Sequence, residues 1–238
     1  MDYAENISGN HAPFTKAGLT RGIKANMAAV PAVIAFGIGF GATALEHDLP
    51  ASAALGMSAF VFAGSAQYAV LELWGEPMPY IAIALITLAL NARHIVLALT
   101  LRQYLARLGA PVKYLALSVL SDANWAASQS AIRKGDMDVA HLAGGGIALW
   151  VAWFIGTAVG VSFGQAIGSL YPYGIDVVMP AFFACALIGL TKGRAEMPAL
   201  ASSALVSALL AAVIALHWAI LIGAAVGAMI GAWCDDEH

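Results

Sequence analysis

Long uncharged stretches alternate with short polar segments along almost the whole chain. A bilayer core about 30 Å thick requires about 20 apolar helical residues, so each long stretch predicts one membrane segment. These stretches, broken only by Arg93 and Asp122, cover residues 25–45, 49–71, 77–101, 114–132, 142–175, 177–191 and 197–233. At about 1.5 Å per residue the last one is too long for one crossing, and it predicts a two-helix hairpin that turns near His217 and Trp218. The pattern predicts an all-α polytopic membrane protein with six to eight hydrophobic helical segments in one domain, residues 1–238.

The positions of lysine and arginine predict the orientation of these segments, because basic residues in short loops stay on the cytoplasmic side. If every segment crosses the bilayer, the basic loop at residues 102–113 lies outside. If residues 51–73 and 114–132 are instead broken or re-entrant, and enter and leave on one side, all ten basic residues other than Arg93 lie inside. Both interpretations stay open here, and both place the two chain termini in the cytoplasm.

A short internal repeat is consistent with a transporter-like plan. The pairs Pro31-Ala32 and Pro50-Ala51 flank an apolar run and an acidic loop, and Pro180-Ala181 and Pro198-Ala199 flank an apolar run and a basic loop. Opposite loop charges place the two copies in opposite orientations, as in inverted-topology repeats. The alternative is that proline favours the first turn of helices and that such pairs recur by chance in an alanine-rich chain.

Composition narrows the function classes. Hydrophobic residues make up 61% of the chain and charged residues 11%, against about 45–50% and about 25% in ordinary soluble domains. The net charge of −3 excludes the broad basic surface that nucleic-acid binding requires. The two cysteines have no metal-ligand spacing, and the chain has no HExxH pair, nucleophile elbow or phosphate-binding GxxxxGK[ST] sequence. We therefore predict no enzyme activity, metal, cofactor or ATP hydrolysis. The polar ends, residues 1–22 and 234–238, are expected in the cytoplasm from the positions of the basic residues.

Two charged residues inside apolar segments require an explanation. An arginine at mid-bilayer costs at least about 2.5 kcal/mol, so Arg93 must face protein or water unless its helix ends early and the side chain reaches the headgroups. Its guanidinium can hold a carboxylate, either of a substrate or of the protein. Asp122 is the natural intramembrane partner by elimination. It either locks helices together or takes up and releases a proton.

A polar break interrupts the second segment at Gly64, Ser65 and Gln67. Non-helical backbone at membrane depth survives where it is buried or lines a cavity, and a helix that starts there directs free N–H groups at an anion. The alternative is close helix packing through small residues. Asn91 and Asn124 are further polar candidates, while His94 is either a helix-interface residue or a proton relay.

Glycines recur at four-residue spacing on three segments: Gly37 and Gly41, then Gly156, Gly160 and Gly164, then Gly223, Gly227 and Gly231. Such faces let helix backbones approach closely. We expect mostly internal packing, with one face left for a second membrane subunit.

Three motifs, FAGSAQ at residues 62–67, LNARHI at 90–95 and SDANWA at 121–126, together resemble the AzlC-like large subunit of branched-chain amino-acid exporters. The resemblance implies export of hydrophobic amino acids across the bacterial inner membrane, together with a small AzlD-like membrane subunit. We further predict that this export is secondary and proton-coupled, because the chain lacks a nucleotide motif and Asp122 can carry a proton. The resemblance marks Gly64, Ser65, Gln67, Asn91, Arg93, His94 and Asp122 as site residues. The chain departs from the family at Ala123, where an acidic residue is expected.

The predicted mechanism places the substrate carboxylate on Arg93 and the broken segment, with Asn91 and Asn124 nearby, and gives Asp122 the ammonium group or the coupling proton. Phe36, Phe60 and Phe62 are expected to shape the hydrophobic pocket. The alternatives are a passive channel for a small neutral solute and a membrane scaffold subunit that does not transport.

Overall fold

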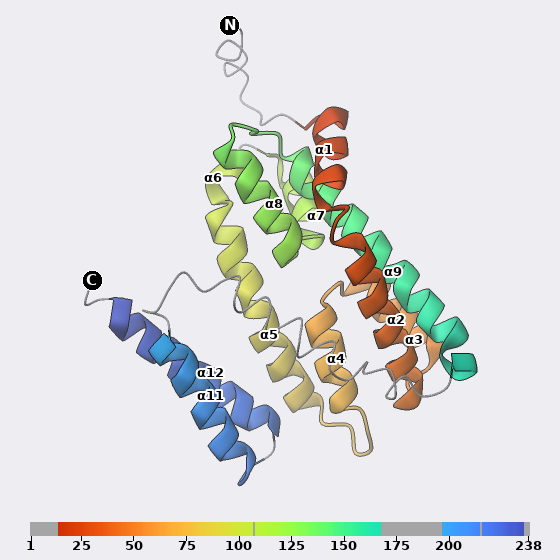
Figure 1. The fold of residues 1–238 in the computed structure, drawn as a ribbon, viewed down its shortest axis with the longest axis vertical. Helices are drawn as coiled ribbons and strands as arrows, with labels where there is room; N and C mark the ends of the chain where they lie inside the picture. Colours follow the sequence, from red (N-terminus) through yellow and green to blue (C-terminus); the bar gives the residue numbers. More distant parts are fainter. Residues whose placement is uncertain (1–13, 107, 168–196, 215, 236–238) are drawn as a thin grey trace, which may run out of the picture. The chain divides into compact units, whose positions relative to one another are not determined.

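The computed structural model describes residues 14–106, 108–167, 197–214 and 216–235, and within them every regular element is a helix (Figure 1). The all-α prediction is confirmed for this part of the chain. The helices are α1 (Lys16–Asn26), α2 (Val30–Glu46), α3 (Ala51–Phe60), α4 (Gly64–Glu72), α5 (Tyr80–Thr100), α6 (Arg102–Leu105), α7 (Ala110–Ser118), α8 (Asp122–Arg133), α9 (Ala140–Ile167), α11 (Met197–Ala211) and α12 (Leu216–Asp235). The predicted segment 177–191 and the second copy of the repeat, from Pro180 up to the pair Pro198-Ala199, lie mostly outside the described residues.

The described helices form two compact groups. The first contains α1 to α4, the second half of α5 from Leu90, and α6 to α9. The second contains the first half of α5 and the pair α11 and α12. The single domain expected from the sequence stays a prediction.

Two helices are long and apolar enough to cross a membrane: α5 and residues Ala140–Gly164 of α9. Helices α1 and α2 meet the same criterion as a pair bent by 70°. The bend has a local cause, because Pro31 lies in the first turn of α2, where proline is well tolerated, and favours a new helix start. The described residues thus contain two candidate spans, or three with the bent pair, and the total of six to eight and the inverted repeat stay predictions.

Both segments that the sequence marks as broken or re-entrant consist of two short helices. Residues 61–63 separate α3 from α4, and Phe62 adopts a φ of 40°, which is unusual for a bulky residue. Residues 119–121 separate α7 from α8, where Ser121 and Asn124 form a reciprocal capping box that starts α8. Helix propagation therefore stops inside each segment, and each segment consists of two half-helices instead of one continuous span.

Helix α9 holds the first group together through its glycines. A Cβ on Gly37 of α2 would lie 2.6 Å from the carbonyl oxygen of Trp153 and 3.0 Å from the Cα of Gly156. Gly41 meets Thr157 and Gly160 in the same way. Because only glycine permits this approach, the four-residue spacing on α2 and α9 is a packing seam between these two helices.

The C-terminal glycines also face a neighbour within the chain. Gly223 and Gly227 of α12 lie against Ser203 and Ser207 of α11. The predicted hairpin is present, but its turn lies at residues 212–214 instead of near His217 and Trp218. The turn comes earlier because the backbone N–H groups of Val213 and Ile214 both bond to the carbonyl of Leu210 and close α11 there. In the described structure each of the three glycine faces is used inside the chain.

Two apolar clusters lie along α9. The first, around Leu101, Leu105, Leu120 and Leu142, joins the end of α5 and the segment α7–α8 to the start of α9. The second, around Phe40, Leu49, Leu71 and Trp153, joins α2 and the segment α3–α4 to the middle of α9. Figure 1 shows this arrangement, with α7 and α8 beside one part of α9 and α3 and α4 beside another. The two broken segments are thereby held separately, each against its own part of α9.

Candidate functional site

Arg93 lies inside α5, and it joins the two broken segments. The helix continues to Thr100, so it does not end early at Arg93. Nη2 of Arg93 donates a hydrogen bond of 3.1 Å to Oγ of Ser65, in the first turn of α4. Nη1 lies 3.0 Å from Oδ2 of Asp122, the first residue of α8. One guanidinium therefore binds the starts of two half-helices that come from different parts of the sequence.

The ion pair is accessible. The side chain of Arg93 is 38% exposed and that of Asp122 is 39% exposed in the described structure. Nε of Arg93 is buried and has no hydrogen-bond partner among the described residues. A charge pair that is partly exposed and lacks one of its possible hydrogen bonds can exchange partners, whereas a buried and fully hydrogen-bonded pair is costly to separate.

The two helix starts differ in how their backbone N–H groups are satisfied. The side chain of Ser121 accepts from the backbone of Asn124 and caps α8. Ala63 precedes α4 and supplies no side-chain cap, so the first N–H groups of α4 are left for another acceptor. Each helix N-terminus carries roughly half a positive charge, and both add to the cation of Arg93. Asp122 is the one carboxylate bound to Arg93 in the described structure, so the site favours an additional anion.

Gly64 and Gln67 face away from this ion pair. A Cβ on Gly64 would lie 2.8 Å from the ring of Trp153, so this glycine allows α4 to start close to α9. Gln67 lies two residues after Ser65, and residues at that spacing do not share a helix face. Its Nε2 donates to Oγ of Ser58 on α3 at 3.3 Å, and its Oε1 is buried without a partner.

A buried polar network around Ser58 joins α3, α4 and α9. The hydroxyl of Ser58 lies 2.8 Å from that of Thr157 and accepts from Nε1 of Trp153 at 3.2 Å. Ser58, Gln67 and Thr157 are completely buried. Sequence reasoning missed Ser58 and Thr157, although hydroxyl residues within apolar helices were an available signal. The network therefore attaches both helices that flank the α3–α4 break to α9.

The remaining predicted site residues occupy different surroundings. Asn124 is completely buried, and its Nδ2 donates to the carbonyls of Val119 at 2.9 Å and Leu142 at 3.1 Å, so it locks the α7–α8 break onto α9. His94 follows Arg93 on α5, and its Nδ1 is buried without a partner in the described structure. Asn91 is half-buried one half-turn before Arg93. Arg93, Ser65 and Asp122 are thus brought together, and Gln67 and Asn124 are not bonded to them.

The three phenylalanines named from the sequence are divided. Phe36 and Phe62 pack against the apolar cluster around Phe40 and Trp153. Phe60, at the end of α3, is 91% exposed. Its position next to the break leaves it outside the packed interface, so it does not belong to an enclosed pocket in the described structure.

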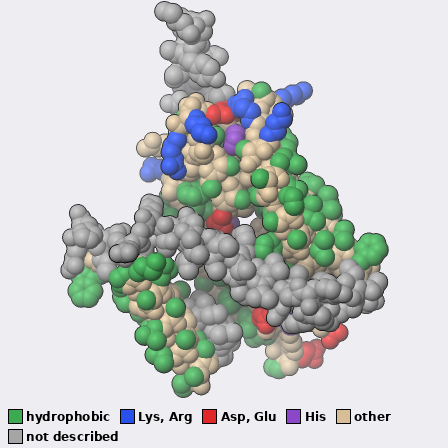
Figure 2. Space-filling model, in the orientation of Figure 1, with side chains coloured by type: hydrophobic (Ala, Val, Ile, Leu, Met, Phe, Trp, Pro, Cys, Tyr) green, Lys and Arg blue, Asp and Glu red, His purple; other side chains and the backbone are tan. Residues whose placement is uncertain are grey.

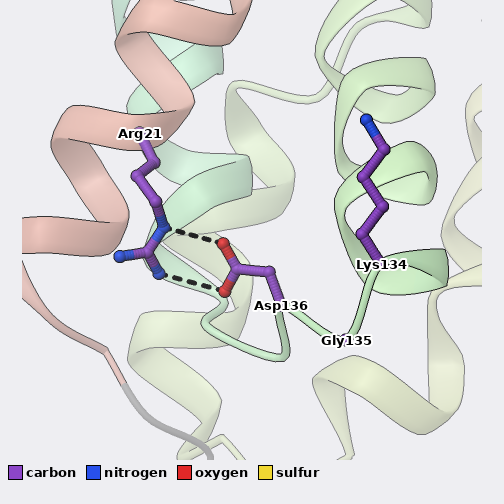
Figure 3. Close-up of a pocket in the computed structure, with 4 residues that line it drawn as sticks. All are labelled: Arg21, Lys134, Gly135 and Asp136. Carbon is purple, nitrogen blue, oxygen red and sulfur yellow. Dashed lines mark hydrogen bonds and ion pairs between the residues drawn. The ribbon is translucent and has the colours of Figure 1, made fainter.

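A second polar cluster joins α1 to the loop between α8 and α9 (Figure 3). Arg21 binds Asp136 through two hydrogen bonds of 2.8 and 3.0 Å, and a pocket of about 450 Å³ separates this pair from Lys134. The hydrogen bonds from Arg21 lower the pKa of Asp136. Asp138 is 5% exposed and binds the hydroxyl of Thr15, which caps α1. Arg21, Asp136, Asp138 and Thr15 bind one another, so these four residues attach α1 to the loop between α8 and α9.

Basic residues gather at one end of the first group (Figure 2). The basic residues of the described chain other than Arg93 lie on or directly after α1, α6, α7 and α8, namely Lys16, Arg21, Lys24, Arg102, Lys113, Arg133 and Lys134. Both ends of the α7–α8 segment reach this region, because Lys113 lines a groove with Arg102, and Lys134 lines a pocket with Arg21. The segment therefore returns to the end from which it starts.

Comparison with known proteins gives one match. The sequence model of a family described as AzlC protein matches residues 28–167, a range that contains all three motifs and the Arg93 site. No curated protein matches the chain. No solved structure matches it either.

Proposed function

The chain belongs to the AzlC family, which is associated with branched-chain amino-acid transport, and we propose that it is a secondary transporter that exports branched-chain or similar hydrophobic amino acids across the bacterial inner membrane. The observation that carries the proposal is the position of Arg93 between the first turns of α4 and α8. Half-helix starts that meet near a charged side chain inside apolar segments are typical of transporter substrate sites. The family and the apolar helices support membrane transport, and the direction, substrate and coupling are the parts proposed here.

The substrate carboxylate binds at Arg93 and the start of α4. A guanidinium presents two parallel N–H groups that match a carboxylate. The uncapped N-terminus of α4 and the hydroxyl of Ser65 supply further donors beside it. Because Asp122 already occupies Nη1, the incoming carboxylate competes with it for the same guanidinium.

Displacement of Asp122 couples binding to a second event. A carboxylate that leaves Arg93 loses its counter-ion, so it must bind the ammonium group of the substrate or take up a proton. In both cases the negative charge of Asp122 is neutralised in the occupied site. When Asp122 takes up the proton, the exchange links substrate binding to proton uptake without ATP, as the proposed proton-coupled mechanism requires.

The polar ends define the proposed orientation. The basic end of the first group faces the cytoplasm, in line with the positive-inside rule. The α7–α8 segment then enters from the cytoplasmic side and returns there, as a re-entrant segment does. A small AzlD-like membrane subunit completes the proposed transporter.

The test is counterflow of radiolabelled leucine, valine and methionine in proteoliposomes, with and without the small partner subunit. We compare the wild type with Arg93→Ala, Asp122→Asn and Ser65→Ala, and use Lys24→Gln and Ser130→Ala as matched controls on the exposed surface. Saturable exchange that is lost in Arg93→Ala and kept in both controls supports the proposal. Absence of exchange for every amino acid, with folded protein, overturns it.

Two other results identify the competing functions. Flux that neither saturates nor depends on a proton gradient indicates a passive channel for a small solute. Loss of stability or of partner binding in Arg93→Ala and Asp122→Asn, without any flux in the wild type, indicates a scaffold subunit. Unfolding profiles in detergent, recorded for each variant, separate a folding defect from a transport defect.

A further inference from the structure

A groove of about 490 Å³ lies at the end of α5, separate from the Arg93 site. Its floor is apolar and includes Ile95, Ala98, Leu99 and Leu117, and two cations, Arg102 and Lys113, line the same groove. The lining therefore combines an apolar channel with a positively charged end. All of these residues belong to the first helix group.

The groove lies at the level where a membrane span ends. The candidate span α5 runs to Thr100, and Arg102 begins α6 directly afterwards. Ile95 and Leu99 are one helical turn apart on the same face of α5, and they are 65% and 62% exposed. With α5 as a membrane span, the apolar part of the groove lies at the depth of acyl chains and the cations at the depth of headgroups.

The two cations have no acidic partner in the part of the chain that the structure describes. The ion pairs found there involve Arg21 and Arg93 only. Arg21, at the same basic end, is held by Asp136, whereas Arg102 and Lys113 share a groove without a described carboxylate. Charge complementarity at this groove therefore has to come from a molecule outside the chain.

We propose that the groove binds an anionic phospholipid. The lipid phosphate lies between Arg102 and Lys113, and one acyl chain follows Ile95 and Leu99 toward the middle of α5. Basic pockets beside helices at the membrane surface are known to select anionic headgroups, and each basic residue near the surface strengthens such binding. The proposal does not depend on the substrate of the transporter, because no residue of the groove contacts Arg93, Ser65 or Asp122 in any interaction described above.

The test measures lipid retention on the full-length protein. Delipidated protein in neutral detergent is titrated with phosphatidylglycerol, phosphatidylcholine or inorganic phosphate, and bound molecules are counted by native mass spectrometry. We expect saturable binding of phosphatidylglycerol, weaker binding of phosphatidylcholine, and no displacement of the lipid by inorganic phosphate. The double variant Arg102→Gln/Lys113→Gln should weaken phosphatidylglycerol binding roughly 30-fold, because each basic residue near the membrane surface contributes about fivefold.

Two further variants make the result specific. Lys16→Gln/Lys24→Gln removes the same charge from exposed positions of α1 and should leave binding unchanged. Ala106→Trp fills the groove at an exposed position without changing the charge and should also weaken binding, which tests the groove even if the double variant is unstable. The proposal is overturned if Arg102→Gln/Lys113→Gln and Ala106→Trp both retain as much phosphatidylglycerol as the wild type. It is also overturned if phosphatidylcholine binds as tightly as phosphatidylglycerol, or if inorganic phosphate displaces the lipid.

Discussion

Nη1 of Arg93 lies 3.0 Å from Oδ2 of Asp122, at the point where α8 begins after a break in the helix. The same guanidinium reaches Ser65, where α4 begins after a second break. A single side chain therefore connects two interrupted segments that pack against different parts of α9. Any event that removes Asp122 from Arg93 changes the electrostatic environment of both helix starts.

Arg93→Lys tests whether the forked shape of the guanidinium matters. Lysine keeps the positive charge but has a single nitrogen, so it cannot hold Ser65 and Asp122 from two separate atoms. Loss of one hydrogen bond to a charged group costs about 1.5–3 kcal/mol, and we expect the half-saturating substrate concentration to rise at least about tenfold. Counterflow kinetics of Arg93→Lys and the surface variant Lys24→Gln measure this. Unchanged kinetics in Arg93→Lys would show that charge alone suffices.

Asn124→Ala tests a structural role for a residue that the sequence assigns to substrate binding. The substitution leaves the buried carbonyls of Val119 and Leu142 without their donor and removes the cap contact to Ser121. We expect the free energy of unfolding to fall by at least about 2 kcal/mol. Thermal unfolding in detergent gives this value, with Ser130→Ala on the exposed side of α8 as control. A stable Asn124→Ala variant with weakened substrate affinity would instead favour the binding role.

Gly37→Leu tests the seam between α2 and α9. A side chain at this position meets the carbonyl of Trp153 and the backbone of Gly156, so the helices must separate. Overpacking of this kind costs about 1–3 kcal/mol. Gly56→Leu on α3 is the matched control, because a Cβ at Gly56 meets nothing within 4 Å. Equal melting temperatures for the two variants would contradict the close approach of α2 and α9.

The pair Arg21 and Asp136 predicts a pH dependence of stability. Hydrogen bonds from Arg21 lower the pKa of Asp136 in the folded state, so the ionised carboxylate stabilises the fold above the ordinary aspartate pKa of about 3.9. This contribution is lost as the pH falls through the lowered value, because both states are then protonated. Unfolding midpoints between about pH 3 and pH 7 should fall more steeply with acid in the wild type than in Asp136→Asn. Parallel curves for the two proteins would show that the pair contributes nothing.

The helical class and the unusual charged and polar residues are recognisable from the amino-acid sequence alone. The chain has uncharged stretches of membrane length, the charge of Arg93 inside one of them, and the polar residues Ser65 and Asp122 inside two others. These features can be recognised from local composition, because burying a charge or a broken backbone in apolar surroundings costs free energy. The interruptions of residues 51–73 and 114–132 were also foreseeable for this reason.

Which polar residues share a site depends on the tertiary packing of the helices. Gln67 is two residues from Ser65, yet the helix turns it toward Ser58, and Asn124 is two residues from Asp122, yet its amide locks onto Leu142. Helical rotation and the packing of α9 against distant segments set these partners, and a one-dimensional pattern carries no distance between segments. The use of the glycine faces within the chain follows from the same cause, because it depends on which backbone lies opposite.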